Sequence, residues 1–236
     1  MRLLPSMIVA RLFVDALRVS ETLIRRGTAE GRRVFFDPAK FGWVDAIERD
    51  WRAVRAELDA VLADRSRIPN FQDVSDEQRA ITQDDRWKVF VFTVFGTRIE
   101  KNCTRCPRTA RLLAGIPGLR NSMFSIVAPR KRIPEHRGPY CGLLRYHLAL
   151  KVPARREDCT IRVDGIDRHW EEGRTMIFDD SFVHSVANET DEERVVLFAD
   201  FERPLPALAA PLNRVMLAGL ARTPLAAQAL ERLNDR

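Results

Sequence analysis

The half of the chain that begins near Ser122 alternates short apolar runs, rich in β-branched residues, with turns that contain proline, glycine and charged residues. Several short strands at this spacing are typical of an antiparallel sandwich or barrel. Within 143–152, Arg145, His147 and Lys151 keep odd positions, so their side chains should share one face of a strand. The pattern predicts a β core of the jelly-roll type, with strands at 122–128, 143–152, 159–164, 174–178 and 193–201.

Helices are expected on both sides of this core. Apolar residues from Val44 to Val61 recur at spacings of three and four, which predicts one surface helix over 43–64. An arginine-bearing amphipathic stretch occupies 1–34. After Pro204 the pattern is helical again, and its expected apolar side consists of Leu208, Leu212, Val215, Leu220 and Leu230.

The segments between the first helices and the β core are mixed. The polar stretch 65–86 contains Pro69 and reads as a loop with one short turn. The aromatic and β-branched residues of 87–95 predict a buried strand there. Pro107 can open a short helix that ends at Gly115. The expected organisation is a single domain, with an N-terminal helical region at 1–86, a β-helix core at 87–204 and a C-terminal helical tail at 205–236.

Composition excludes several classes of protein. Among 236 residues, 45% are hydrophobic, so the chain can bury a core and is not intrinsically disordered. Four cysteines in a chain of this length make no disulfide framework and fit a reducing cytoplasm. The Cys103-x-x-Cys106 pair has no second pair nearby, which favours ordinary thiols over a zinc or redox site. No run approaches the roughly 18 apolar residues that a membrane span needs.

The formal net charge of +6 indicates an anionic partner without choosing one. Nucleic acid, an acidic membrane face and a carboxylate or phosphate ligand would all attract such a chain. The sequence has no interleaved basic and aromatic strand and no nucleic-acid motif, so a nucleic-acid partner is not expected. The basic, amphipathic ends favour a protein that is cytoplasmic, with peripheral contact at the anionic inner face of the membrane as an alternative.

Histidines give the first chemical signal. His136 is followed 48 residues later by His184, and Arg194 comes ten residues further on. In a jelly roll this order can bring two imidazoles together at the mouth of the barrel, where non-haem iron is bound, with an arginine ready to pair with a carboxylate. The third position of the usual triad is Gly138 rather than aspartate. From spacing alone, two separate histidines of the core or surface remain the alternative.

Several motifs occur in order along residues 122–205, and together they resemble the catalytic domain of the aspartyl/asparaginyl β-hydroxylase family. The resemblance implies a double-stranded β-helix that uses Fe(II), 2-oxoglutarate and O₂, with ascorbate as reductant. The motifs are Pro134-Glu-His-Arg-Gly-Pro139, Leu144-Arg-Tyr-His-Leu148, Cys159-Thr-Ile-Arg162, Trp170-Glu-Glu-Gly173, Ile177-Phe-Asp-Asp-Ser-Phe182 with His184, and Arg194 before an apolar strand.

The resemblance also implies roles for individual residues. His136 and His184 would be the iron ligands, and Gly138 would leave one ligand position open for water. Asp180 would hold that water by a hydrogen bond.

At the cosubstrate, Arg194 and Ser125 would bind the distal carboxylate of 2-oxoglutarate. Arg145 would contact the carboxylate nearest the iron, with His147 beside it.

The substrate stays open at this point. The family contains hydroxylases of protein Asp or Asn side chains and bacterial hydroxylases of lipid acyl chains. The run 143–148, the turn 163–165 and the ending 200–204 look closer to the lipid branch, whereas Gly138 is typical of the protein branch. The transmembrane helix with which lipid A hydroxylases typically begin is not visible. A small amino-acid-like metabolite and a jelly-roll binding module without catalysis are further alternatives.

Overall fold

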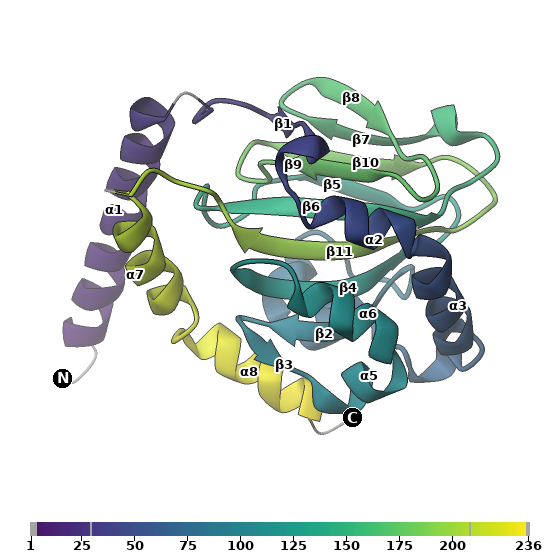
Figure 1. Ribbon diagram of the computed structural model, residues 1–236. Helices are drawn as coiled ribbons and strands as arrows, with labels where there is room; N and C mark the ends of the chain where they lie inside the picture. The colour runs from purple at the N-terminus through teal and green to yellow at the C-terminus, as the bar shows by residue number, and fades with distance from the viewer. Residues whose placement is uncertain (1–3, 29, 208, 235–236) are drawn as a thin grey trace.

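The computed structural model describes residues 4–28, 30–207 and 209–234, and for 4–14, 225 and 234 it describes the backbone alone. The strands of this part form two antiparallel sheets (Figure 1). In order across the larger, seven-stranded sheet they are β1 (Phe35–Phe36), β9 (Thr175–Phe178), β6 (Leu143–Lys151), β11 (Arg194–Glu202), β4 (Leu119–Val127), β2 (Trp87–Val94) and β3 (Thr97–Arg98). The smaller sheet has the order β5 (Arg132–His136), β10 (His184–Asn188), β7 (Cys159–Val163) and β8 (Ile166–His169).

The two sheets face each other as a double-stranded β-helix, which confirms the predicted fold class. Alternation along β11 decides what lies between them. Val196 and Phe198 join the buried cluster that also contains Ile161 and Val186 of the smaller sheet. Leu197 lies in a second cluster on the opposite face of the larger sheet. The even-numbered residues of β11 therefore point into the barrel, and this places Arg194 and Asp200 inside it as well.

Helices cover the outer face of the larger sheet (Figure 1). Their apolar sides bury Ile47, Leu58 and Leu113 against side chains from the sheet. The covering helices are α2 (Val44–Arg49), α3 (Trp51–Leu62), α5 (Glu100–Arg105) and α6 (Pro107–Ala114).

A second group of helices lies away from that face. The long α1 (Leu4–Gly27) contacts α7 (Ala210–Leu220), and α8 (Pro224–Asn234) contacts β2 and the short α4 (Phe71–Val74). Figure 1 shows α7 and α8 running in succession from α1 towards β3. Within the described residues, no helix combines the length and the apolar character that crossing a bilayer requires. Short 3₁₀ segments occupy Pro38–Lys40, Arg65–Arg67, Asp76–Ala80 and Arg156–Asp158.

The structure corrects the prediction of one helix over 43–64. The helix divides at Asp50, whose backbone leaves helical geometry at φ −95° and ψ 7°. The carboxylate of Asp50 forms an ion pair with Arg108 of α6. The apolar spacing is kept across the break, so periodicity could not reveal it. The segment 65–86 holds α4 and two 3₁₀ segments rather than one short turn.

The predicted apolar side of the C-terminal tail is confirmed at Leu220 and Leu230, which pack against buried clusters, and wrong at two other positions. Leu212 and Val215 are 38% and 61% exposed, whereas α7 buries Asn213, Met216 and Leu217. Leu208 lies outside the described residues. Asn213 is buried because its amide donates a hydrogen bond of 3.0 Å to the carbonyl of Gly142. A polar residue at a core position defeats a search for hydrophobic periodicity.

The four cysteines are free and buried. Burial is the main cause that raises the pKa of each thiol, and it raises the pKa of Cys106 and Cys141 to about 12. At neutral pH these side chains are therefore protonated thiols, which act as small apolar groups in the core.

Candidate active site

The structure brings His136 and His184 together. His136 is the last residue of β5 and His184 is the first residue of β10, two strands that are absent from the predicted set. The two residues are direct cross-strand partners, and their ring centroids are 4.1 Å apart. Antiparallel pairing thus joins histidines that are 48 positions apart in the sequence.

Backbone carbonyls fix the tautomer of both imidazoles. Nδ1 of His136 lies 2.8 Å from the carbonyl oxygen of Pro134, and Nδ1 of His184 lies 3.0 Å from that of Phe182. Because a carbonyl can only accept, each Nδ1 carries the proton and each Nε2 keeps its lone pair. Burial lowers the pKa of His136 and lowers that of His184 to about 3, with Arg145 adding to both effects. Both side chains are therefore neutral nitrogen donors, the form that binds a metal ion.

Gly138 is required by the position of Asp180. A Cβ atom on Gly138 would lie 2.0 Å from Oδ2 of Asp180, far inside van der Waals contact. The amide of Gly138 also donates to the carbonyl of Asp180 at 2.8 Å, which holds the two segments together. Within the described residues, no three His, Cys, Asp or Glu side chains form a metal-binding group. A metal ion bound here would have two imidazoles as protein donors, and other coordination positions would be left for ligands outside the chain.

Asp180 contacts a row of charged side chains on the inner face of the larger sheet. Nη2 of Arg145 lies 2.7 Å from Asp180, and its Nε donates to Asp200 at 2.9 Å. Asp200 also accepts a hydrogen bond of 3.1 Å from Asn121. Burial raises the pKa of Asp180, although Arg145 acts in the opposite direction. Arg145, predicted as a cosubstrate contact, is therefore already paired with two carboxylates.

Arg194 is a buried cation that forms no ion pair with any described residue. The residue is 2% exposed, and within the described part of the chain its Nε and Nη1 have no hydrogen-bond partner. Its guanidinium carbon lies 4.4 Å from the centre of the Trp170 ring, and the thiol of Cys159 also interacts with the guanidinium. Burial lowers the pKa of Arg194 to about 10, so it is still charged at neutral pH. A charge buried in this way is costly until an anion pairs with it.

Ser125 and His147 lie on the same inner face as Arg194. In the register of β4 and β11, Ser125 is opposite Val196, one diagonal step from Arg194. Its hydroxyl oxygen accepts a hydrogen bond of 3.0 Å from Trp87, so the hydroxyl proton can be donated elsewhere. Nδ1 of His147 accepts from Trp170 at 3.4 Å, and burial holds the pKa of this histidine well below its usual value. His147 is thus neutral with its proton on Nε2.

Some polar residues near the site were missed by sequence reasoning. Asp200 could have been found, because it follows Arg194 at an even interval and must face the same way in a strand. Asp179 has no predicted role beyond its place in the motif at 177–182, whereas it is fully buried and paired with Arg203. No local pattern marks that pair, since its two residues lie on separate segments.

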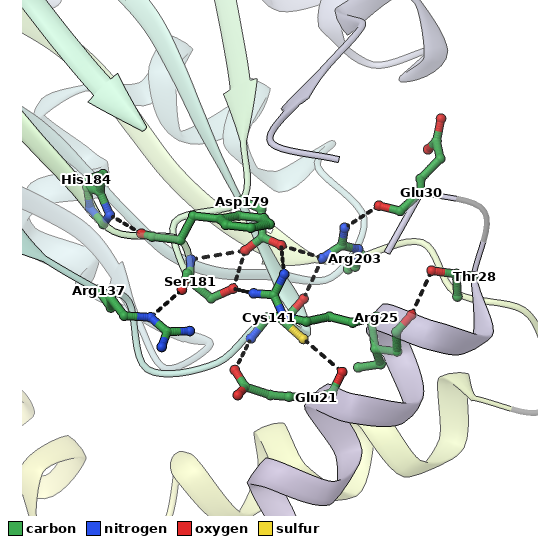
Figure 2. Close-up of polar contacts among 12 residues, drawn as sticks. Glu21, Arg25, Thr28, Glu30, Arg137, Cys141, Asp179, Ser181, His184 and Arg203 are labelled. Carbon is green, nitrogen blue, oxygen red and sulfur yellow. Dashed lines mark hydrogen bonds and ion pairs between the residues drawn. The ribbon is translucent and has the colours of Figure 1, made fainter. Parts of the chain in front are cut away.

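A buried network ties α1 to the loop that precedes His184 (Figure 2). Arg203 donates to Asp179 at 2.8 Å and to the carbonyl of Cys141 at 3.0 Å. Arg25 of α1 donates to the hydroxyl of Ser181 at 2.7 Å, and Ser181 in turn donates to Asp179. The loop that carries Asp180 is therefore held by α1 and by the residue that follows β11.

Comparisons with known proteins agree on one family. The model of the family described as aspartyl/asparaginyl beta-hydroxylase matches residues 48–204. An ornithine lipid ester-linked acyl 2-hydroxylase of Rhizobium tropici is 41% identical over 94% of this chain and 79% of its own length. The human aspartyl/asparaginyl beta-hydroxylase is 32% identical over 68% of this chain. The match spans 21% of that human protein, about a fifth of its length.

Among solved structures, a prolyl-4-hydroxylase of Pseudomonas putida matches with a TM-score of 0.42 and 14% identity. The match covers 69% of this chain and all of that one.

The buried pair of Asp179 and Arg203 gives a first prediction. Asp179→Asn keeps the shape of the side chain but leaves Arg203 without its anion, which should lower the free energy of unfolding by about 3–5 kcal/mol. The control is Arg130→Gln, which breaks the exposed pair with Asp191 and should change it by less than about 1 kcal/mol. Chemical denaturation measures both variants. Equal stability of the two would contradict the role of the network.

The contact between Gly138 and Asp180 gives a second prediction. Gly138→Ala should lower the free energy of unfolding by about 1–3 kcal/mol, because the new Cβ overlaps Asp180. In an Asp180→Ala background the same substitution should cost less, since the space is free. Gly42→Ala is the control, because a Cβ there meets nothing within 4 Å. Additive effects in this double-mutant cycle would show that the overlap is not the cause.

Proposed function

This chain belongs to the aspartyl/asparaginyl β-hydroxylase family, and from that membership we propose that it is an Fe(II)- and 2-oxoglutarate-dependent hydroxylase. Two features of the site together support the cofactors best. One is the pair of adjacent neutral imidazoles, and the other is the buried guanidinium of Arg194, whose Nε and Nη1 have no hydrogen-bond partner among the described residues. Bound iron and 2-oxoglutarate would supply the oxidising chemistry, in which O₂ is consumed, succinate and CO₂ are released and a substrate carbon gains a hydroxyl group.

The residues fit this pair of cofactors. His136 and His184 would hold the iron through Nε2, because their Nδ1 atoms are bonded to the backbone. Arg194 would pair with the distal carboxylate of 2-oxoglutarate, which would give its Nε and Nη1 the partners that they lack. Ser125 would donate its hydroxyl proton to the same carboxylate.

Arg145, Asp180 and His147 would serve the other end of the cosubstrate. His147 can donate from Nε2 to a carboxylate oxygen, and Arg145 would keep positive charge near it. Asp180, held in place by Arg145, would accept a hydrogen bond from a water molecule at the position that Gly138 leaves open.

We assign the substrate to the lipid branch of the family and propose that the reacting carbon belongs to an acyl chain. The lipid acyl hydroxylase of Rhizobium tropici matches nearly the whole chain, whereas the human protein matches two thirds of it at lower identity. Gly138, which had favoured a protein substrate, has a local explanation in the position of Asp180. It is therefore no argument for either substrate.

Peripheral contact with an anionic membrane is part of this proposal. The helices α1 and α7 pack against each other, and each exposes large apolar side chains, Val19 and Leu23 on α1 and Leu212 and Val215 on α7. The same helices carry the exposed cations Arg18, Arg26 and Arg214. Apolar side chains flanked by arginines suit the headgroup region of an anionic bilayer.

The cofactor roles can be separated by two substitutions. His184→Ala should reduce Fe(II) affinity at least a hundredfold, because it removes a proposed metal ligand. Loss of a residue that only supports a ligand typically costs roughly tenfold to hundredfold in affinity. Arg194→Met should weaken 2-oxoglutarate at least about thirtyfold and leave iron binding unchanged. Isothermal titration under anaerobic conditions measures both affinities.

The controls are His169→Ala and Arg168→Met, which change exposed residues of β8. Both should bind Fe(II) and 2-oxoglutarate like the unchanged chain.

Succinate release from 2-oxoglutarate with Fe(II) and ascorbate tests the activity of the unchanged chain. Failure to turn over 2-oxoglutarate with lipid or peptide substrates would refute the proposed function.

The membrane contact generates a further prediction. Val215→Glu should lower the affinity for vesicles of anionic phospholipid, measured by sedimentation, about tenfold. The substitution replaces an apolar contact with a negative charge, which the anionic headgroups repel. Ile166→Glu is the matched control, an exposed apolar residue on β8. If both variants sediment like the unchanged chain, α7 does not touch the membrane.

A further inference from the structure

A cavity of about 210 Å³ opens between the mouth of the barrel and the C-terminal helices. Its volume is far above the roughly 15 Å³ that a single water molecule needs. One end is formed by Arg145, Asp180 and Asp200, the charges that lead to the two histidines. The rest is lined mainly by apolar side chains of the barrel and the helices, among them Met123, Phe198, Leu217, Leu220 and Ala229.

We propose that this cavity holds the acyl chain of the substrate lipid. The inference rests on the proposed hydroxylase function and adds the place in the fold where the acyl chain is bound. The chain would enter beside α7 and α8, with the carbon to be hydroxylated at the end near Asp180. Its remaining methylene groups would lie against Leu217, Leu220 and Met123.

The distribution of polar groups favours an acyl chain over a peptide. A peptide brings a backbone N–H and C=O at each residue, and each of these loses free energy if it is buried without a partner. The walls supplied by Phe198, Leu217 and Ala229 cannot provide those partners. Polar side chains such as Arg120 and Asn121 also line the cavity, but these two are already paired with Glu202 and Asp200. An acyl chain needs none, and its transfer from water to such walls is favourable for every methylene group.

The helix α7 connects this cavity with the proposed membrane contact. Leu217 and Leu220 line the cavity, whereas Leu212 and Val215 of the same helix are exposed to solvent. A lipid that leaves the bilayer at α7 would therefore need to pass only one helix to reach the cavity.

The cavity is tested by filling it. Ala221, at the end of α7, is partly exposed and lines the cavity, so Ala221→Trp would place an indole where the chain is expected. Binding of cis-parinaric acid, a fluorescent fatty acid, to the full metal-free chain is the readout. The affinity should fall at least about tenfold. Ala227→Trp, an exposed position on α8 that does not line the cavity, should bind the probe like the unchanged chain.

A milder variant, Leu220→Asn, keeps the test informative if the tryptophan prevents folding. It should weaken the probe several-fold, because an amide replaces an apolar wall. Equal probe affinity in Leu220→Asn and the unchanged chain, absence of probe binding, or displacement of the probe by an aspartate-containing peptide would overturn the proposal. Absence of iron-dependent turnover of 2-oxoglutarate, with probe binding intact, would instead contradict the proposed function alone.

Discussion

The ion pair of Asp179 and Arg203 is the interaction on which the arrangement of the site depends. It is fully buried, and it lies where α1, the end of β11 and the loop before His184 meet. Because a lone buried charge is strongly destabilising, neither partner can leave without the other. The pair therefore anchors the loop between β9 and β10, which carries the carboxylate of Asp180 and leads to His184.

From that loop, constraints pass to the rest of the site through direct contacts. Asp180 occupies the space beside residue 138 and so requires glycine there, and it also pairs with Arg145. Arg145 then meets Asp200, which shares the inner face of β11 with Arg194. Asp180, Arg145 and Asp200 thus form a line of contacts that leads from the histidine pair to the inner face of β11, where Arg194 lies.

The sequence predicts much of the fold, because strands with alternating polarity and helices with apolar stripes leave clear signals. It also places Arg145 and His147 on one face, since parity along a strand decides which way a side chain points. Lys151 was expected on the same face, but it lies opposite the outward-facing Val195, because the register of β6 and β11 shifts between Val195 and Val196. What it cannot show depends on contacts between distant segments. Examples are the break at Asp50, the burial of Asn213 and the pair of Asp179 with Arg203. The shared tautomer of His136 and His184 belongs here too, because it depends on carbonyl positions.

The buried thiols have a consequence for a protein proposed to work beside ferrous iron and oxygen. Oxidants and soft metal ions attack the thiolate rather than the thiol. With the pKa of Cys106 and Cys141 raised to about 12, and that of Cys103 and Cys159 raised as well, thiolate is scarce at neutral pH. The oxidants that the proposed chemistry would generate would therefore find few reactive thiolates in this chain.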